Sequence, residues 1–588
     1  MKQDDRFSEI RSLVHRETWR REEREHMWQL IEASCREDKE RFRSEVVPYL
    51  VDYERKFESC LVAFKSATTF MNAARVAPFA RFRLEVKAVE ELQEVLNSQY
   101  VHSLGGVHFS HHGEGSEGLK LLSRHDEKLC HLIELGVSFN RLDVDAIERL
   151  SRSAYVKRLT WLGLRKCELG TAHIKALSSG HTFDALETLH IGENQPGFEG
   201  FGVLFEEFCS PALREIELSA SAFSSMGRRG GDTFLEDAGL ELLAGCAAMQ
   251  NVRSLSANFS RISAKGVQAL VNSDHLPHLE QLMLDTNPNI GVSGANVIAN
   301  SKGCARLMYL SLSQCQLGDD GAKALASSPY LRDLQLLDLS SNKIGDEGVE
   351  ALSKSDVLSG VHTLNLGANR IAEEGATALF SSDKLASLTS LSFFGNGFGA
   401  STHEAYLRNT RLRGLKSLNL GGCKISDELA SHMLMSSMFE GVKSLILSRN
   451  NLSHLSAAAF RDTISLNDVE VLQVRDSQFT PEDFEVFFEA DLKALKELTL
   501  SGRRLGDVGV KALLRTPYIG RLKVLRLQGM DLTNDHLMWI AKGRWESLRE
   551  LDLLMNYNLS DVEPLKQAQW FKSLERFSVE RHETRYPW

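Results

Sequence analysis

Histidines are concentrated in one stretch of this 588-residue sequence, between residues 102 and 131. Three of them, His108, His111 and His112, stand close enough in the chain to share a metal ion. No cysteine or carboxylate spacing around them completes a recognised metal-binding motif, so we expect packed or solvated histidines and predict no metal site. The motifs GxxxxGKS/T, GxSxG and HExxH, which serve nucleotide binding, ester hydrolysis and zinc-dependent proteolysis, do not occur. We therefore predict no catalytic residues, no cofactor and no enzymatic activity.

The nine cysteines do not suggest a disulfide framework. Their number is odd and no CxxC pair occurs, which suits a reducing compartment. Cys167, Cys315 and Cys423 occupy equivalent places in the repeats described below. The expected role of these three residues is a small buried side chain in a turn. A redox or metal role is the alternative.

Charge and hydropathy limit where the protein can be located and which partners it can bind. Lys and Arg number 69 and Asp and Glu number 79, which gives a net charge of −10 without any block of like charge. This balance does not favour a phosphate-rich partner, so we predict no nucleic-acid binding. The N-terminal segment is charged throughout and no run of 18 apolar residues occurs. We therefore expect no secretory signal, no membrane span and a cytoplasmic location.

The chain repeats one pattern, LxxLxLxxNxLxxxGxxxL, over most of its length. Neighbouring copies start 26, 27 or 28 residues apart, with a single exception of 39 residues, so the period is about 27. Chance does not keep such a register. The first template positions are Leu132, Leu159, Leu186, Leu213, Val252, Leu279, Leu307, Leu334, Val361, Leu388, Leu415, Val442, Val469, Leu495, Leu522, Leu548 and Leu574.

Each repeat is predicted to contain one strand and one helix. The segment xLxL alternates apolar and polar residues, which is the period of a half-buried strand, and the stretch after it has helical spacing. Parallel strands lie about 4.8 Å apart and packed helices about 8–10 Å apart, so stacking places the helices outside a curve. We predict an α/β solenoid shaped as a horseshoe, with a parallel sheet on its concave side and α-helices on its convex side.

Polar residues at fixed template positions are expected to stabilise the turns. Ser426 and Asp319 are predicted to cap helices by accepting hydrogen bonds from free N–H groups. An asparagine that follows the strand can satisfy backbone groups in the turn. It occurs as Asn140, Asn194, Asn287, Asn342, Asn369, Asn396, Asn450 and Asn556.

The unit LQLLDLSSNKIGDEGVEALSKSDVL, from Leu334 onward, resembles the ribonuclease-inhibitor-like class of leucine-rich repeats, of the large bacterial type. The resemblance covers roughly residues 76–580. It implies a solenoid with an α-helix on the convex side of each repeat. The class contains inhibitors, sensor domains, GTPase-activating proteins and scaffolds, so the resemblance implies protein–protein recognition without naming the partner.

The repeats predict three parts of the chain. Residues 1–75 lack the repeat but keep helical spacing, which predicts about three helices in a domain that caps the first repeat or docks a partner. Residues 76–580 hold the repeats, with an inserted loop at 222–234 that accounts for the long interval. Residues 581–588 form a C-terminal tail.

Partner-binding residues are sought at positions three, five and seven of each LxxLxLx unit, which should face the concave side. From Leu186 to Val442 these positions are mostly small and polar. Trp, Tyr and Arg, the usual binding hot spots, are few there. With Phe394 and the arginine pair of the inserted loop, the candidates are Trp161, Arg165, Arg228, Arg229, Tyr309, Phe394, Arg475 and Arg526.

A role without a partner is the alternative for some of these candidates. Trp161 and Phe394 would have a structural role if they only pack on adjacent strands. Arg228 and Arg229 could pair with a carboxylate or phosphate of a partner, or belong to a tolerated surface insertion. Acidic residues on the same face favour a partner with a basic surface, and they are Glu215, Glu217, Asp285, Asp338, Glu550 and Asp552.

The sequence therefore favours a non-enzymatic scaffold or adaptor that binds a protein partner through its repeat surface. One alternative is a regulator of a small GTPase, for which the Arg228 and Arg229 loop is the only candidate element. Another is a secreted effector whose repeats select a host protein. Neither alternative has a catalytic motif of its own in the sequence.

Overall fold

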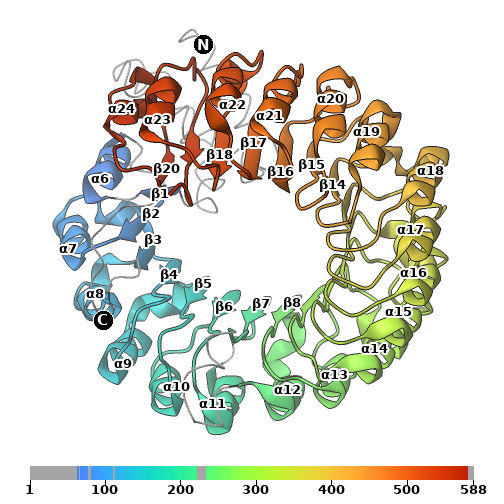
Figure 1. The fold of residues 1–588 in the computed structure, drawn as a ribbon. Helices are drawn as coiled ribbons and strands as arrows, with labels where there is room; N and C mark the ends of the chain where they lie inside the picture. Colours follow the sequence, from blue (N-terminus) through green and yellow to red (C-terminus); the bar gives the residue numbers. More distant parts are fainter. Residues whose placement is uncertain are drawn as a thin grey trace. The chain divides into compact units, whose positions relative to one another are not determined.

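The computed structural model describes residues 62–64, 66–76, 81–109, 113–208, 210–221 and 234–579. They form two compact units, which divide between Leu284 and Asp285. In each unit the strands line the inner side and the helices the outer side (Figure 1). Within these ranges, no helix combines the length and the hydropathy that a membrane crossing requires.

Unit 1 ends at Leu284, and its strands pair in parallel and in chain order. Leu135 lies beside Leu162, and Leu162 beside Leu189, so the pairing follows the 27-residue period. The strands are β1 (Val62–Phe64), β2 (Phe82–Val86), β3 (Leu104–Phe109), β4 (Glu134–Gly136), β5 (Trp161–Gly163), β6 (Thr188–His190), β7 (Glu215–Glu217), β8 (Ser254–Ser256) and β9 (Gln281–Met283). The helices are α6 (Ala67–Val76), α7 (Val89–Asn97), α8 (Gly115–Arg124), α9 (Val144–Arg152), α10 (Thr171–Ser178), α11 (Gly197–Val203), α12 (Glu236–Gly245) and α13 (Ala264–Val271).

Unit 2 begins at Asp285 and keeps the same parallel order, with Leu310 beside Leu337 and Leu337 beside Leu364. Its strands are β10 (Tyr309–Ser311), β11 (Leu336–Asp338), β12 (Thr363–Asn365), β13 (Ser390–Ser392), β14 (Ser417–Asn419), β15 (Ser444–Ile446), β16 (Val471–Ser477), β17 (Glu497–Gly502), β18 (Val524–Gln528), β19 (Glu550–Asp552) and β20 (Arg576–Ser578). Its helices are α14 (Gly291–Asn300), α15 (Gly318–Ala326), α16 (Asp346–Ser353), α17 (Glu373–Phe380), α18 (Ala400–Arg408), α19 (Asp427–Met435), α20 (His454–Asp462), α21 (Pro481–Phe487), α22 (Gly506–Leu513), α23 (Asn534–Ala541) and α24 (Glu563–Lys566).

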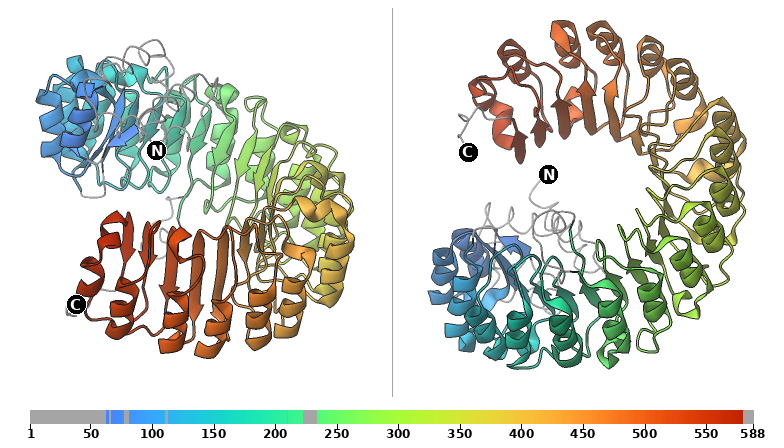
Figure 2. Two further views of the ribbon diagram at one scale, coloured as in Figure 1. Left: turned by 90° about the horizontal axis from the view of Figure 1, so that it is seen from above. Right: turned by 60° about the horizontal axis from the view of Figure 1, so that its bottom comes forward.

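The core of each repeat lies between its strand and its helix. Leu334, Leu337 and Leu339, at template positions one, four and six, are fully buried. Their polar neighbours on the strand turn the other way, because side chains alternate across a strand. Figure 2 shows the two layers of each unit from two further directions. The predicted leucine-rich-repeat solenoid is confirmed, with positions three and five on the inner face.

The template asparagine links neighbouring repeats. Asn342 Oδ1 accepts the backbone N–H groups of Cys315 (2.9 Å) and Leu317 (3.3 Å) in the preceding repeat. Its Nδ2 donates to the backbone oxygens of Leu312 (2.7 Å) and Ser340 (3.1 Å). The buried side chain thus forms hydrogen bonds with backbone groups that the pairing of strands leaves without a partner. This confirms the predicted role of the asparagine.

Cysteine takes the asparagine position in some repeats. The thiols of Cys167 and Cys423 lie 3.2 and 3.3 Å from the carbonyl oxygens of Val137 and Phe393. Burial raises the pKa of both thiols to about 12, so they are protonated at neutral pH. A buried, protonated thiol is a poor nucleophile and a poor metal ligand. The surroundings therefore favour the structural role.

A second contact between repeats explains the template glycine. Asp319 Oδ1 accepts the backbone N–H groups of Gly345 (2.7 Å) and Gly348 (2.9 Å) at the start of α16. A Cβ atom at Gly348 would lie 2.6 Å from the same oxygen, so only glycine permits this approach. The prediction that Asp319 caps its own helix is wrong, because it lies in the first turn of α15 and caps the next helix. Ser426 does cap its own helix, by accepting the Leu429 N–H at 3.2 Å.

The stack of repeats extends further toward the N-terminus than the sequence predicted. Residues 62–76, assigned to the helical domain, form strand β1 and helix α6. Strand β1 pairs in parallel with β2, and Phe64 lies beside Leu84. Residues 1–61 lie outside the described residues, so the helices predicted there stay a prediction. The same holds for the tail at 581–588.

Candidate functional site

Three rings stand in a row on the inner face of unit 1. They belong to His108, Trp161 and His190, on strands β3, β5 and β6. The His108 and Trp161 rings stack with their centroids 4.8 Å apart and their planes 14° apart. His190 meets Trp161 edge to face at 5.4 Å. All three side chains are partly exposed, so this ring row presents aromatic surface to solvent.

Two glycines make room for the ring row. A Cβ atom at Gly136 would lie 2.9 Å from Cγ of His108, and one at Gly163 would lie 2.4 Å from Cη2 of Trp161. Gly136 pairs with His108 on one side and with Gly163 on the other. The rings therefore fill space that ordinary side chains of β4 and β5 would occupy. An alanine at either glycine would displace a ring.

A charge cluster lies beside His108. Arg83, on β2, donates to the carboxylates of Glu85 and Glu134 at 3.1 Å each. Burial raises the pKa of Glu134, and the Arg83 charge opposes that rise. Burial and then the Arg83 charge lower the pKa of His108 to about 3, so the ring is neutral at neutral pH.

The neutral His108 ring is incompletely satisfied. Its Nε2 atom is buried and has no hydrogen-bond partner in the described part of the chain. The nearest carboxylate oxygen, Oε2 of Glu134, lies 3.7 Å away, beyond hydrogen-bond length. A buried polar atom without a partner costs about 1–3 kcal/mol.

Carboxylates also lie at the other end of the ring row. Glu215 Oε1 lies 3.0 Å from His190 Nε2, and the Glu215 side chain is 46% exposed. Glu217 accepts the backbone N–H groups of Gly192 (3.2 Å) and Ser219 (3.0 Å). The charged side chains around the rings are thus mostly acidic. Four are glutamates and one is an arginine, namely Glu85, Glu134, Glu215, Glu217 and Arg83.

Among the predicted partner-binding residues, Trp161 lies at the centre of the ring row. It also packs against the rings of His190, on the adjacent strand, and of His108, two strands away, which agrees with the structural alternative. Arg165 belongs to the same repeat, and its Nη2 atom lies 2.7 Å from Oε1 of Glu193, whose side chain is buried. The Arg165 guanidinium therefore already has an ion-pair partner in the next repeat.

The other described candidates lie in separate repeats of unit 2. Tyr309 is exposed on β10. Phe394 packs over the next repeat, where a Cβ atom at Gly421 would lie 3.1 Å from its ring. Arg475 has a buried Nε atom without a hydrogen-bond partner among the described residues. Arg526 is paired with Glu550 at 2.7 Å. Each of these four residues stands in a repeat of its own.

Some predicted residues lie outside the described part of the chain. These are Arg228 and Arg229 of the inserted loop and His111 and His112 of the histidine stretch. Their suggested roles stay predictions. Across the described ranges, no group of three or more His, Cys, Asp or Glu side chains is arranged to hold a metal ion.

The sequence missed the charge cluster of the site. Glu134 stands at position three of the repeat that starts at Leu132, so the template rule could have found it. Arg83 and Glu85 alternate with buried residues of β2, in a repeat whose template is imperfect. His108 was predicted to be a packed or solvated histidine, without a named partner. Its partner is an aromatic ring two strands away, which no local spacing reveals.

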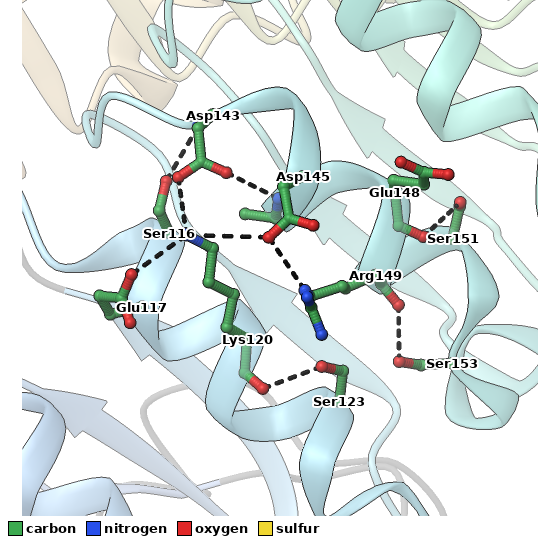
Figure 3. Close-up of polar contacts among 11 residues, drawn as sticks. Ser116, Glu117, Lys120, Ser123, Asp143, Asp145, Glu148, Arg149, Ser151 and Ser153 are labelled. Carbon is green, nitrogen blue, oxygen red and sulfur yellow. Dashed lines mark hydrogen bonds and ion pairs between the residues drawn. The ribbon is translucent and has the colours of Figure 1, made fainter.

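A polar hollow lies between α8 and α9, among the side chains drawn in Figure 3. It is lined by Ser123, Asp126, Asp145, Glu148, Arg149, Arg152 and Ser153. Lys120 Nζ lies 3.0 Å from Asp143 and 3.1 Å from Glu117, and Arg149 Nε lies 2.9 Å from Asp145. Such solvated ion pairs contribute little to stability. The Lys120–Asp143 pair links the two helices, and we assign the hollow no function.

Comparison with known proteins identifies the repeats. A family model described as Leucine Rich repeat matches residues 303–326, 330–353 and 413–428. The chain is built from leucine-rich repeats. No curated protein matches this leucine-rich-repeat chain.

Two solved structures are similar to the leucine-rich-repeat chain. One is an internalin (inlF) from Listeria monocytogenes str. 4b F2365, with 17% identity, 79% of this chain and 94% of that chain covered, and a TM-score of 0.30. The other is a chain in the Rad7 and Elc1 complex in yeast, with 17% identity, coverage of 60% and 82%, and a TM-score of 0.37.

Proposed function

We propose that this leucine-rich-repeat protein is a cytoplasmic, non-enzymatic scaffold or adaptor that holds a protein partner on the ring row of unit 1. The observation that carries the proposal is the ring row itself. A partly exposed Trp161 stands between two histidine rings, and two glycines keep the space free. Trp residues in such central positions dominate the binding energy of many protein interfaces. The helix in each repeat supports the ribonuclease-inhibitor-like subtype.

The proposed partner presents a basic group to this surface. Glu215 is nearly half exposed at one end of the ring row, and Glu134 is partly exposed near the other. An incoming Lys or Arg side chain beside these carboxylates would gain charge complementarity. A polar group of the partner could also supply the missing hydrogen bond of His108 Nε2. No observation on the described residues favours the GTPase regulator or the secreted effector.

The test compares two aromatic residues at the same template position. The full chain, Trp161→Ala and Tyr309→Ala are each immobilised and used to capture proteins from a native lysate. A partner retained by the parent is then produced in pure form, and its affinity is measured by calorimetry. We expect Trp161→Ala to weaken binding by about 30-fold or more, the loss typical of a hot-spot residue.

Tyr309→Ala serves as the matched control, because it removes an exposed aromatic ring from unit 2. It should bind the partner as the parent does. Thermal unfolding of both variants separates binding from folding. Equal affinity of parent and Trp161→Ala, with both folded, would remove the ring row as the docking site.

A further inference from the structure

A row of basic side chains runs along one edge of the sheet in unit 2. Its members stand at the second template position, just before strands β14 to β19. The backbone N–H of each donates to the carbonyl oxygen of the member before it, at 2.7 or 2.8 Å, so the side chains are direct lateral neighbours. This basic edge row consists of Lys416, Lys443, Glu470, Lys496, Lys523 and Arg549.

Internal ion pairs neutralise only part of the basic edge row. Glu470 lies between two lysines, with Lys496 Nζ at 2.5 Å and Lys443 Nζ at 3.6 Å. Lys443 Nζ also lies 3.6 Å from Asp468, and Arg549 Nε lies 3.9 Å from Glu575, which continues the ladder beyond the row. Lys416 and Lys523 are exposed and have no carboxylate within 4.0 Å among the described residues. Lys416 Nζ only donates to the Gly441 carbonyl at 3.3 Å. The row therefore keeps an excess of positive charge, in a chain whose net charge is −10.

The repeat template does not require this charge. The same lateral ladder continues to Thr389, His362 and Gln335 in the three preceding repeats of unit 2. None of these three residues is a Lys or Arg. The fold accepts uncharged side chains at this position, so folding alone does not explain why the basic residues occur together.

We propose that the basic edge row is a second docking surface, which takes an extended acidic segment of a protein partner. Five steps between parallel strands span about 24 Å, the length of about seven extended residues. Each lysine is a flexible point charge that can reach a carboxylate without a fixed geometry. The segment would lie across the ends of the strands and pair with Lys416 and Lys523 first, because these have no carboxylate of their own.

The observations favour an acidic protein segment over nucleic acid. Surfaces that bind single-stranded nucleic acid usually combine positive charge with aromatic platforms for the bases. The basic edge row contains no aromatic residue. A long polyanion would also meet the acidic remainder of the chain, whereas a short segment can be confined to the row.

The experiment uses the full chain and a fluorescein-labelled peptide of ten glutamates, followed by anisotropy at about 50 mM salt, where charge pairs are weakly screened. We expect saturable binding that weakens about tenfold in the double variant Lys416→Gln and Lys523→Gln. The control is Lys323→Gln with Lys354→Gln, which removes the same charge from helix α15 and from the C-cap of helix α16. It should leave the affinity unchanged.

Three results would overturn the proposal. The peptide could fail to bind the parent, or the control pair could weaken binding as much as the row pair. A ten-nucleotide RNA that binds more tightly than the peptide, and loses affinity in the row variant, would assign the row to nucleic acid. The measurement does not involve Trp161, so its failure would leave the function proposed for the ring row untouched.

Discussion

The inner faces of the two units use the same template positions in opposite ways. In unit 1, rings and carboxylates gather between β2 and β7, and the buried Nε2 of His108 has no partner in the described structure. In unit 2, the face from β10 to β13 carries Tyr309, Leu336 and otherwise small polar side chains, several of which bond to one another. Asp338 Oδ1 accepts the Ser340 N–H (2.8 Å) and hydroxyl (2.6 Å), and its Oδ2 accepts Nδ2 of Asn365 (2.7 Å).

This difference between the two faces shows that the inner positions of a repeat can either stabilise the sheet or remain available to a partner. A side chain that bonds to its lateral neighbour stabilises the sheet and has little left to offer a partner. The rings of unit 1 lie against Gly136 and Gly163 and have carboxylates at both ends. They leave surface and charge available to a partner. This difference is consistent with the proposed recognition on the face of unit 1 and with a mainly stabilising role of the small polar face of unit 2.

The largest expected effects are equal in the two units, because the core beneath both faces is the same. Leu162→Ala and Leu337→Ala each remove a fully buried side chain between two repeats. Each should lower the free energy of unfolding by about 2–5 kcal/mol. Chemical denaturation measures both. A loss for one variant alone would show that the units differ in their cores and not only in their inner faces.

Acidic side chains on the two faces should respond differently to removal. Asp338→Ala removes the acceptor of half-buried hydrogen bonds from Ser340 and Asn365 and should cost about 0.5–1.5 kcal/mol. Glu215→Ala removes an exposed side chain and should change stability by no more than about 0.5 kcal/mol. The same denaturation experiment compares them. A Glu215 variant as destabilised as the Asp338 variant would contradict the division of tasks.

The sequence predicted the frame of the molecule well, since the frame depends on periodicity. Leu337 and Asn342 recur with the template, so their burial and their turn contacts follow from the spacing. Asp319 was predicted to cap the wrong helix, because its contact crosses to the next repeat. Only stacking brings Asp319 to Gly348.

The site was harder to predict than the frame. Trp161 was found by residue type and template position alone. His108 and Arg83 come from imperfect repeats, and what matters about them is a neighbour two strands away or a buried charge. Glu134 stands at position three of its repeat, yet it was not named among the acidic residues of the inner face. Lateral contacts of this kind depend on the pairing of strands, which the repeat length gives only approximately.

Acid should weaken the ring row through His108. Burial and the Arg83 charge lower its pKa from 6.5 in the unfolded chain to about 3. The unfolded state therefore binds more protons between these values, and stability falls as the pH drops below 6.5. The loss from this residue should reach about 1.4 kcal/mol at pH 5.5. His108→Gln cannot titrate, so its stability should depend less steeply on pH between 6.5 and 5.5.

The small polar face of unit 2 should respond to pH with the opposite sign. Burial raises the pKa of Asp285, and hydrogen bonds from Ser311 and Ser313 oppose the rise. The folded state then binds the proton more tightly than the unfolded chain does. The stability from Asp285 is present below the unfolded pKa and is lost as the pH rises through the folded one. Parallel pH slopes for His108→Gln and Asp285→Asn, each relative to the parent, would contradict this contrast.

The smallest expected effect belongs to Tyr309, which stands at the same template position as Trp161. Its side chain is 37% exposed, and no other ring contacts it among the described residues. Tyr309→Ala therefore removes neither a stacked pair nor a buried group, and should change the free energy of unfolding by less than about 0.5 kcal/mol. Trp161→Ala loses its contacts with His108 and His190, so it should be the more destabilised of the two. The denaturation midpoints of the two variants compare their stabilities. Trp161 and Tyr309 share their template position and register. If the Tyr309 variant lost as much stability as the Trp161 variant, an aromatic residue at position three would stabilise the sheet in both units. The ring row would then have no role of its own.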